Sequence, residues 1–217
     1  MTEQAAVTYT WSETWKQVVS DPSKELFQQI MNDPRASFNR AMTWIYLGGM
    51  GIAIIVFVLP IMVIASLSDA LDSSLTIPLL FVGPVVGGLL ISLLFLGNVA
   101  TIHWLSRLSG GRGSFATTAY VLASIVTPFS LINVLLLLIP ILGWIMISVM
   151  GVYQLIVTIL ALQALYDFDW GQAILIGIIP PAVLNILVIV AYYAIIFAIL
   201  FAIADNPDAF FPPTPTP

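Results

Sequence analysis

Apolar residues follow one another along this chain in long blocks that short polar breaks separate. Four blocks contain no Asp, Glu, Lys or Arg, and they cover residues 41–68, 73–106, 113–166 and 170–204. A helix needs about 20 apolar residues to cross a hydrocarbon core about 30 Å thick. Each block can therefore cross a membrane once, and the third can cross twice, so the pattern predicts five spans.

Prolines mark two places where we expect these spanning helices to break. Pro128 lies in the middle of the third span, and Pro180 and Pro181 separate a short lead-in helix, 171–179, from the last span. Proline lacks the N–H that continues a helix, and its ring clashes with the preceding turn. The predicted fold class is all-α, a polytopic membrane helix bundle in residues 43–204. The expected spans are 43–67, 75–105, 115–139, 142–166 and 182–203.

Residues 1–42 precede the first span and show short amphipathic helices that end at Asp-Pro pairs. Trp11 and Trp15 lie one turn apart on one helix face, and Phe27 lies on the apolar face of the next helix. Such helices often lie in the headgroup layer, so we expect these three residues, with Trp104, to be interfacial anchors. The alternative is a cap that packs on the membrane bundle.

The distribution of basic residues predicts the orientation. All six Lys and Arg residues lie in residues 1–42 or in the polar loop after the second span, and the other polar breaks contain none. Basic residues near span ends favour the cytoplasmic side. The N-terminus is therefore expected in the cytoplasm, and with five spans the Pro-rich tail, 205–217, is expected on the extracytoplasmic side.

The composition excludes several classes of function. The chain is 60% hydrophobic and 8% charged, whereas soluble domains carry about a quarter charged residues. It has no cysteine and one histidine, so disulfides, thiolate metal sites and zinc sites with two histidines are excluded. Six basic residues and a net charge of −5 exclude a nucleic-acid partner. We expect no catalytic residue, no metal and no cofactor.

Small and polar residues recur at helical spacing on the second, third and fourth spans. Small side chains let helices approach closely, and hydroxyl groups can bond across the seam, so we expect these residues to mediate helix–helix packing. The alternative is a polar groove for a lipid headgroup or a solute. The residues are Gly83, Gly87, Ser124, Thr127, Gly151, Gln154 and Thr158.

The loop between the second and third spans is the expected place for a functional contact. Its glycines can take positive φ and allow close approach, its arginine supplies a charge, and its serine stands where an N-cap would lie. The alternatives are a tight turn with a cap and, for the histidine, a simple anchor or a pigment or haem ligand. The candidate partner or lipid contact comprises Gly110, Gly111, Arg112, Gly113, Ser114 and His103.

The segment SGGRGSF, residues 109–115, and the two spans after it resemble the prokaryotic type of the Yip family, the Ypt/Rab-interacting membrane proteins. The shared features are this glycine-rich entry, the proline at 128, the Leu-Gly-Trp start of the fourth span, and a last block that opens with Ala-Ile-Leu. The resemblance implies five spans, a cytosolic N-terminus and an extracytoplasmic C-terminus. Eukaryotic members are adaptors in ER–Golgi traffic that contact small GTPases. Because residues 1–42 lack the family's DLYGP-type motif, contact with a small GTPase is not implied here.

Three functions remain open. The first is a non-catalytic membrane scaffold, adaptor or accessory subunit that contacts the lipid bilayer and other integral membrane proteins, or a second copy of itself. The second is a lipid-handling or small-solute transporter or channel that uses the proline-broken helices. The third is a subunit that holds a pigment or haem at His103. The expected location is the prokaryotic cytoplasmic membrane, with the ER or Golgi membrane as the eukaryotic alternative.

Overall fold

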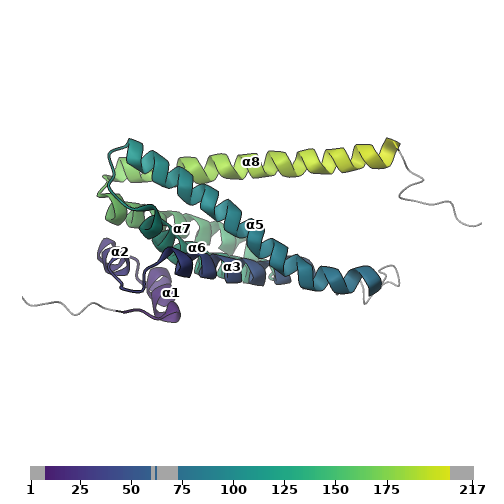
Figure 1. Cartoon of the computed structure of the whole chain (residues 1–217), viewed down its shortest axis with the longest axis horizontal. Coiled ribbons are helices and arrows are strands. Elements are labelled where there is room, and N and C mark those ends of the chain that lie inside the picture. The colour runs from purple at the N-terminus through teal and green to yellow at the C-terminus, as the bar shows by residue number, and fades with distance from the viewer. Residues whose placement is uncertain (1–7, 60–61, 63–72, 206–217) are drawn as a thin grey trace, which may run out of the picture. The chain divides into compact units, whose positions relative to one another are not determined.

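The computed structural model describes residues 8–59, 62 and 73–205, and in this part of the chain every regular element is a helix (Figure 1). A π-helical turn, η1, directly continues α3. The elements are α1 (Trp11–Ser20), α2 (Lys24–Met31), α3 (Phe38–Ala53), η1 (Ile54–Val58), α5 (Ser73–Leu108), α6 (Phe115–Leu136), α7 (Leu142–Tyr166) and α8 (Trp170–Asp205).

Hydroxyl side chains begin four of these helices. Thr10, Ser23, Ser37 and Ser114 each accept a hydrogen bond from a backbone N–H in the first turn of the following helix, which satisfies a group that the helix leaves unpaired. The Thr10 hydroxyl also donates to the carboxylate of Glu13 over 2.7 Å, and this bond lowers the pKa of Glu13. The helix starts are therefore decided locally.

Three helices are long and apolar enough to cross a membrane, and they are Leu80–Leu108, Phe115–Leu136 and Leu142–Tyr166. The stretch Trp170–Leu184 is a shorter apolar helix. The expected first span, 43–67, begins within α3 but extends beyond the described residues, as does most of the expected tail. The described residues thus establish an all-helical protein with three candidate spans.

Neither predicted helix break at proline is present. α6 contains Pro128, and α8 contains both Pro180 and Pro181, yet each is one helix. Water cannot replace lost backbone bonds inside a bilayer, so a helix that continues past a proline keeps more bonds than a helix that stops there. By compactness the chain divides into residues 1–178 and 179–217, and the following paragraphs concern the first unit.

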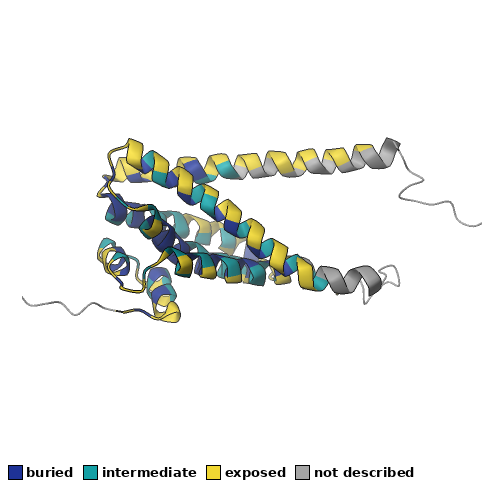
Figure 2. Cartoon of the chain, viewed as in Figure 1, coloured by how far each residue is buried: buried dark blue, intermediate teal, exposed yellow. Residues whose placement is uncertain are grey.

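α6 is the central helix of the first unit. It packs against α3 on one side and α7 on another, and α5 packs on both α3 and α6 (Figure 1). Within the most apolar window of each helix, 67% of α6 is buried, against 28% of α5 and 22% of α7. The outer faces of α5 and α7 therefore remain apolar and exposed (Figure 2).

Glycines bring α3 close to both α5 and α6. A Cβ on Gly87 would lie 2.5 Å from the Cβ of Ala53, and a Cβ on Gly48 would lie 2.8 Å from a methyl carbon of Thr127. Two expected packing glycines behave differently, because the described residues place nothing within 4 Å of a Cβ at Gly83 or Gly151. Gly83 is half-buried and Gly151 is exposed, so the described residues show no close contact at either glycine, and their packing role stays a prediction.

The predicted hydroxyl bonds across the α6–α7 seam are also absent at the expected residues. Ser124 is buried and donates to the carbonyl of Val121, and Thr158 donates to the carbonyl of Gln154, so each bonds within its own helix. Serine and threonine often bond back to the preceding turn in this way. The helices are nevertheless neighbours, as the short hairpin between them predicts.

The N-terminal segment is a cap that packs on the bundle. α1 contacts α6, and α2 contacts both α6 and α7. Phe27 is 0% exposed, so the prediction that it anchors the protein in the membrane interface is wrong: its ring lies in the protein core. Trp15 is half-buried, with its ring centroid 5.8 Å from that of Trp44, whereas Trp11 and Trp104 are exposed.

A buried ion pair ties this cap to α3. Arg40 Nη1 lies 3.5 Å from Asp33 Oδ2, and Arg40 Nη2 donates to the carbonyl of Tyr9 over 2.9 Å. The guanidinium group also lies over the rings of Trp44 and Tyr120, 5.0 and 5.7 Å from their centroids, where cation–π attraction adds to the pairing. Arg40 thus joins the segment before α1, the turn after α2, and α6.

Candidate functional site

The loop between α5 and α6 follows a tight path. The N–H of Gly110 donates to the carbonyl of Arg107, and that of Gly111 donates to Ser106 over 2.9 Å, which closes the end of α5. Gly110 has a φ of +89°, in the left-handed region. Glycine adopts this conformation without a Cβ penalty, so the turn requires it at this position.

The next two glycines lie against the ring of Tyr166. A Cβ on Gly111 would lie 2.6 Å from Tyr166 Cδ1, and a Cβ on Gly113 would lie 2.6 Å from Tyr166 Cε1. The same ring stacks on Phe168, with centroids 5.3 Å apart. The loop backbone can approach the end of α7 only because these two positions lack side chains.

The hydroxyl of Tyr166 joins three helices. It lies 2.9 Å from His103 Nδ1 on α5 and 2.6 Å from Thr118 Oγ1 on α6. Thr118 already donates its only hydroxyl hydrogen to the carbonyl of Ser114, so it must accept from Tyr166. The Tyr166 oxygen then accepts from His103, which requires the hydrogen of this histidine on Nδ1.

His103 therefore takes part in a hydrogen-bond chain that leads through Tyr166 and Thr118 to the N-cap of α6. Its ring also meets Phe115 edge-on, with centroids 5.7 Å apart. Tyr166 is not among the residues that the sequence predicts for this site. Its place just before the polar break at 167–169 marks it as a helix-end residue. Its two hydrogen-bond partners, however, lie 48 and 63 residues away along the chain, so the local pattern does not reveal them.

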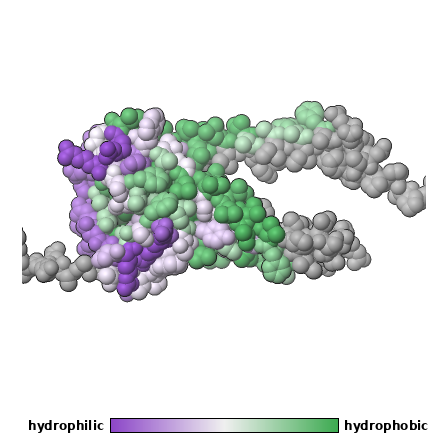
Figure 3. Space-filling view, in the orientation of Figure 1, coloured by the Kyte–Doolittle hydropathy of each residue, from purple (hydrophilic) through white to green (hydrophobic). Residues whose placement is uncertain are grey.

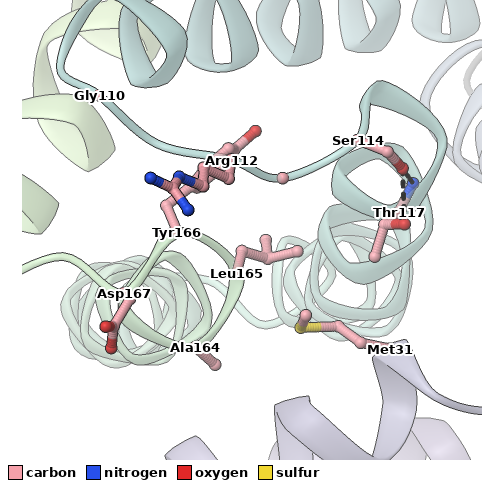
Figure 4. Close-up of a pocket in the computed structure, with 10 residues that line it drawn as sticks. Met31, Gly110, Arg112, Ser114, Thr117, Ala164, Leu165, Tyr166 and Asp167 are labelled. Carbon is pink, nitrogen blue, oxygen red and sulfur yellow. Dashed lines mark hydrogen bonds between the residues drawn. The ribbon is translucent and has the colours of Figure 1, made fainter.

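A groove of about 510 Å³ lies between this loop, the end of α7 and α2 (Figure 4). Four of the predicted contact residues line it. Gly111, which is buried, and His103, which contacts the Tyr166 hydroxyl, do not. Arg112 and Asp167 lie at one end, and Ser114, Thr117 and Met31 lie at the other (Figure 4). The lining residues are Met31, Gly110, Arg112, Gly113, Ser114, Thr117, Ala164, Leu165, Tyr166 and Asp167.

The acidic residue at the groove has a charged partner, and the basic residue has none in the described chain. Asp167 pairs with Lys24 over 3.3 Å, while Arg112 is exposed and has no ion pair or hydrogen bond from its guanidinium group within the described residues. The Lys24–Asp167 pair is exposed, so its attraction is weak and screened by salt. The groove therefore presents one cation that no carboxylate of the described chain neutralises.

Two hydroxyl groups begin α6 beside the groove. Ser114 Oγ accepts from the N–H of Thr117 over 3.1 Å and lies 2.7 Å from Thr117 Oγ1. One hydroxyl hydrogen serves the bond between the two side chains, so the other remains available to a ligand. A guanidinium group and a free hydroxyl together provide donors that bind an oxyanion.

The described residues contain no group of three or more His, Asp or Glu side chains that could hold a metal ion. Asp167, at the end of α7, has a positive φ of 56°, and Asp169 caps α8 by accepting from the N–H of Gln172 over 2.8 Å. These two carboxylates thus act at helix ends.

Comparison with known proteins agrees with this architecture. The family model of the Yip1 domain matches residues 16–192. The matched region includes the second half of α1, all of α2 to α7 and every residue that lines the groove. No match was found among curated proteins or among solved structures.

Proposed function

The chain belongs to the Yip family of membrane proteins, and on this premise we propose that it works as a non-catalytic scaffold, adaptor or accessory subunit. In this proposal it crosses the membrane five times, with the N-terminus in the cytoplasm and the C-terminus outside. Its work is to hold other membrane proteins, or a second copy of itself, through contacts between helices and at the membrane surface.

The observation that carries the proposal is the division of the molecule into two kinds of surface. Within the first unit, on the face that Figure 3 shows, hydrophilic residues gather at the end formed by α1, α2 and the α5–α6 loop, and hydrophobic residues cover the helices beyond that end. Buried contacts hold the N-terminal cap on the bundle, as the full burial of Phe27 and Ile30 shows. A preformed polar cap on an apolar bundle offers a cytoplasmic partner and a membrane partner separate surfaces.

Photo-cross-linking in intact membranes tests the proposal. A photoreactive residue is placed at Leu93 on α5 or Val152 on α7, which are 63% and 62% exposed, and at exposed Gln28 on the cap. We expect at least one position to give a high-yield adduct with one protein species or with a second copy of the chain. Adducts with lipid alone from both helices, with none from the cap, would refute a scaffold.

The orientation is tested separately, and the natural absence of cysteine makes this simple. With Ser109→Cys we expect protection from a membrane-impermeant thiol reagent applied outside, and with Ser73→Cys we expect labelling. The physical reason is that all six basic residues lie on the side of Ser109, where they favour the cytoplasm. The reverse labelling pattern would overturn the orientation but not the scaffold.

The transporter and the pigment hypotheses have less support from the structure. The transporter hypothesis depended on helices broken at proline, and α6 and α8 both continue through their prolines. Within the described residues, the pigment hypothesis gains no support from a second ligand or a cavity at His103; its Nδ1 lies 2.9 Å from the Tyr166 hydroxyl, which leaves Nε2 as the ring nitrogen that a pigment could bind. An absorption spectrum of the purified protein tests for a bound pigment directly.

A further inference from the structure

We propose that the groove between α2, the α5–α6 loop and the end of α7 binds the phosphate of an anionic membrane phospholipid, with Arg112 as its principal cation. The inference deepens the proposed function by naming a ligand for the polar end of the molecule. It depends on that proposal only in placing this end at a membrane surface.

The groove lies at the level of the membrane where lipid headgroups are expected. Two candidate spans meet the groove at their ends, since one begins at Phe115 and the other ends at Tyr166. Ser114 and Asp167, which are the next residues outward, both line the groove. Polar headgroups occupy the layer just outside the hydrocarbon core, so the groove opens where lipid phosphates are concentrated.

The charge fits a phosphodiester. Arg112 and Asp167 are the charged residues that line the groove, and Asp167 is paired over 3.3 Å with Lys24 of α2, which does not line it. This pairing leaves Arg112 as the positive charge without a partner in the described chain. Basic pockets at the cytoplasmic ends of membrane helices bind anionic headgroups in this way, and guanidinium can donate two parallel bonds to a phosphate.

The rest of the lining matches the parts of a phospholipid next to its phosphate. The free hydroxyl hydrogen of the Ser114–Thr117 pair can donate to a phosphate oxygen. Gly113 carries no side chain that would shield its backbone from the groove. Met31, Ala164 and Leu165 supply apolar surface for the glycerol and the first methylenes of an acyl chain. A free phosphate ion would leave this apolar surface uncovered.

The experiment measures lipid binding by the purified full-length protein in a neutral detergent. Short-chain phosphatidylglycerol is titrated, and bound lipid is counted by native mass spectrometry. Arg112→Gln should weaken binding about tenfold, since a hydrogen bond to a charged group contributes an affinity factor of that order. Arg112→Lys should lose less because it keeps the charge. Arg107→Gln is the matched control, because Arg107 is exposed on the last turn of α5 and does not line the groove.

A second variant tests the location without changing the charge. Ala164→Phe places a large side chain in the groove and should also weaken phosphatidylglycerol binding about tenfold or more. An equal loss in Arg107→Gln and Arg112→Gln, or unchanged binding in both groove variants, would overturn the inference. So would inorganic phosphate that binds as tightly as the lipid, or neutral short-chain diacylglycerol that does. Because the readout is lipid bound to purified protein, its failure leaves the cross-linking test of the scaffold unaffected.

Discussion

Replacing Tyr166 with phenylalanine tests whether its hydroxyl holds three helices together. The change keeps the ring, so the contacts with Gly111, Gly113 and Phe168 remain. It removes only the oxygen that lies 2.9 Å from His103 Nδ1 and 2.6 Å from Thr118 Oγ1. Tyr166 is 6% exposed, so water cannot readily take the place of the missing group.

The expected loss follows from the number of bonds and their surroundings. Hydrogen bonds between membrane helices average about 0.6 kcal/mol and reach about 1.7 kcal/mol, and a buried group left without its partner costs about 1–3 kcal/mol. Two bonds are lost, but Thr118 keeps its bond to the Ser114 carbonyl. We therefore expect Tyr166→Phe to lower the free energy of unfolding by about 1–2 kcal/mol.

The measurement is unfolding of the protein in mixed micelles, by titration with a denaturing detergent and followed by tryptophan fluorescence and circular dichroism. Tyr46→Phe is the matched control: Tyr46 is half-buried on α3, and its hydroxyl has no hydrogen bond in the described part of the chain. Thr118→Val should cost less in the Tyr166→Phe background than in the wild type, because the bond between the two side chains is already lost there and only the bond to the Ser114 carbonyl remains to be removed.

The reasoning would be refuted if Tyr166→Phe and Tyr46→Phe had the same stability. It would also be refuted if Thr118→Val and Tyr166→Phe were fully additive, because residues that share a bond should show a coupling energy. Either result would mean that the ring of Tyr166 holds the loop and that its hydroxyl does not hold the helices.

Two further predictions concern the loop and the cap. Gly111→Ala should lower the free energy of unfolding by about 1–3 kcal/mol in the same assay, because the new Cβ would lie 2.6 Å from the Tyr166 ring. Gly110→Ala should lower it by only about 1–2 kcal/mol, because there is open space around Gly110 and the cost comes from its φ of +89° alone. A larger loss at Gly110 would contradict the packing argument. Arg40→Met should leave the carboxylate of Asp33 buried without its cation, which costs about 3–5 kcal/mol, and protease should then cut α1 and α2 faster. Exposed Arg35→Met is the control, and equal cutting in both variants would contradict a role for the ion pair in holding the cap.

Much of the helical layout is predictable because its signals are local. α7 has the predicted bounds, Leu142–Tyr166, and α6 begins at the predicted residue, Phe115. Ser114 caps α6 as its position suggests, and both Asp-Pro pairs end their helices. Caps, turns and apolar runs depend on neighbours within one or two turns, so one sequence contains all the information that they require.

The predicted helix breaks at proline are wrong because the prediction used only local signals. Proline removes one backbone bond from a helix, and the local rule counts only that loss. In a bilayer the alternative is worse, because a chain that leaves the helix exposes several polar groups where no water is present. The environment of α6 and α8, and not the residue next to the proline, decided that both helices continue.

For the candidate site, the sequence by itself determined which loop would matter and which residue types it would offer. It indicated the glycines, Arg112 and the N-cap Ser114, because turn chemistry and charge can be read without knowing the neighbours. It left open whether the loop is a turn or a contact site, and the structure shows a turn whose outer side forms one wall of a groove.

Only the tertiary structure decided what that loop faces and which side chains are buried. Tyr166 and Met31 come to the groove from α7 and α2, and Lys24 pairs with the lining residue Asp167. Phe27 was assigned to the membrane although it lies in the core. Arg40 was counted as a charge that orients the chain, yet it forms the ion pair that holds the cap. An amphipathic helix shows which face must leave water, but not whether lipid or protein covers it. That choice depends on contacts between residues far apart in the chain, which hydrophobic periodicity does not encode.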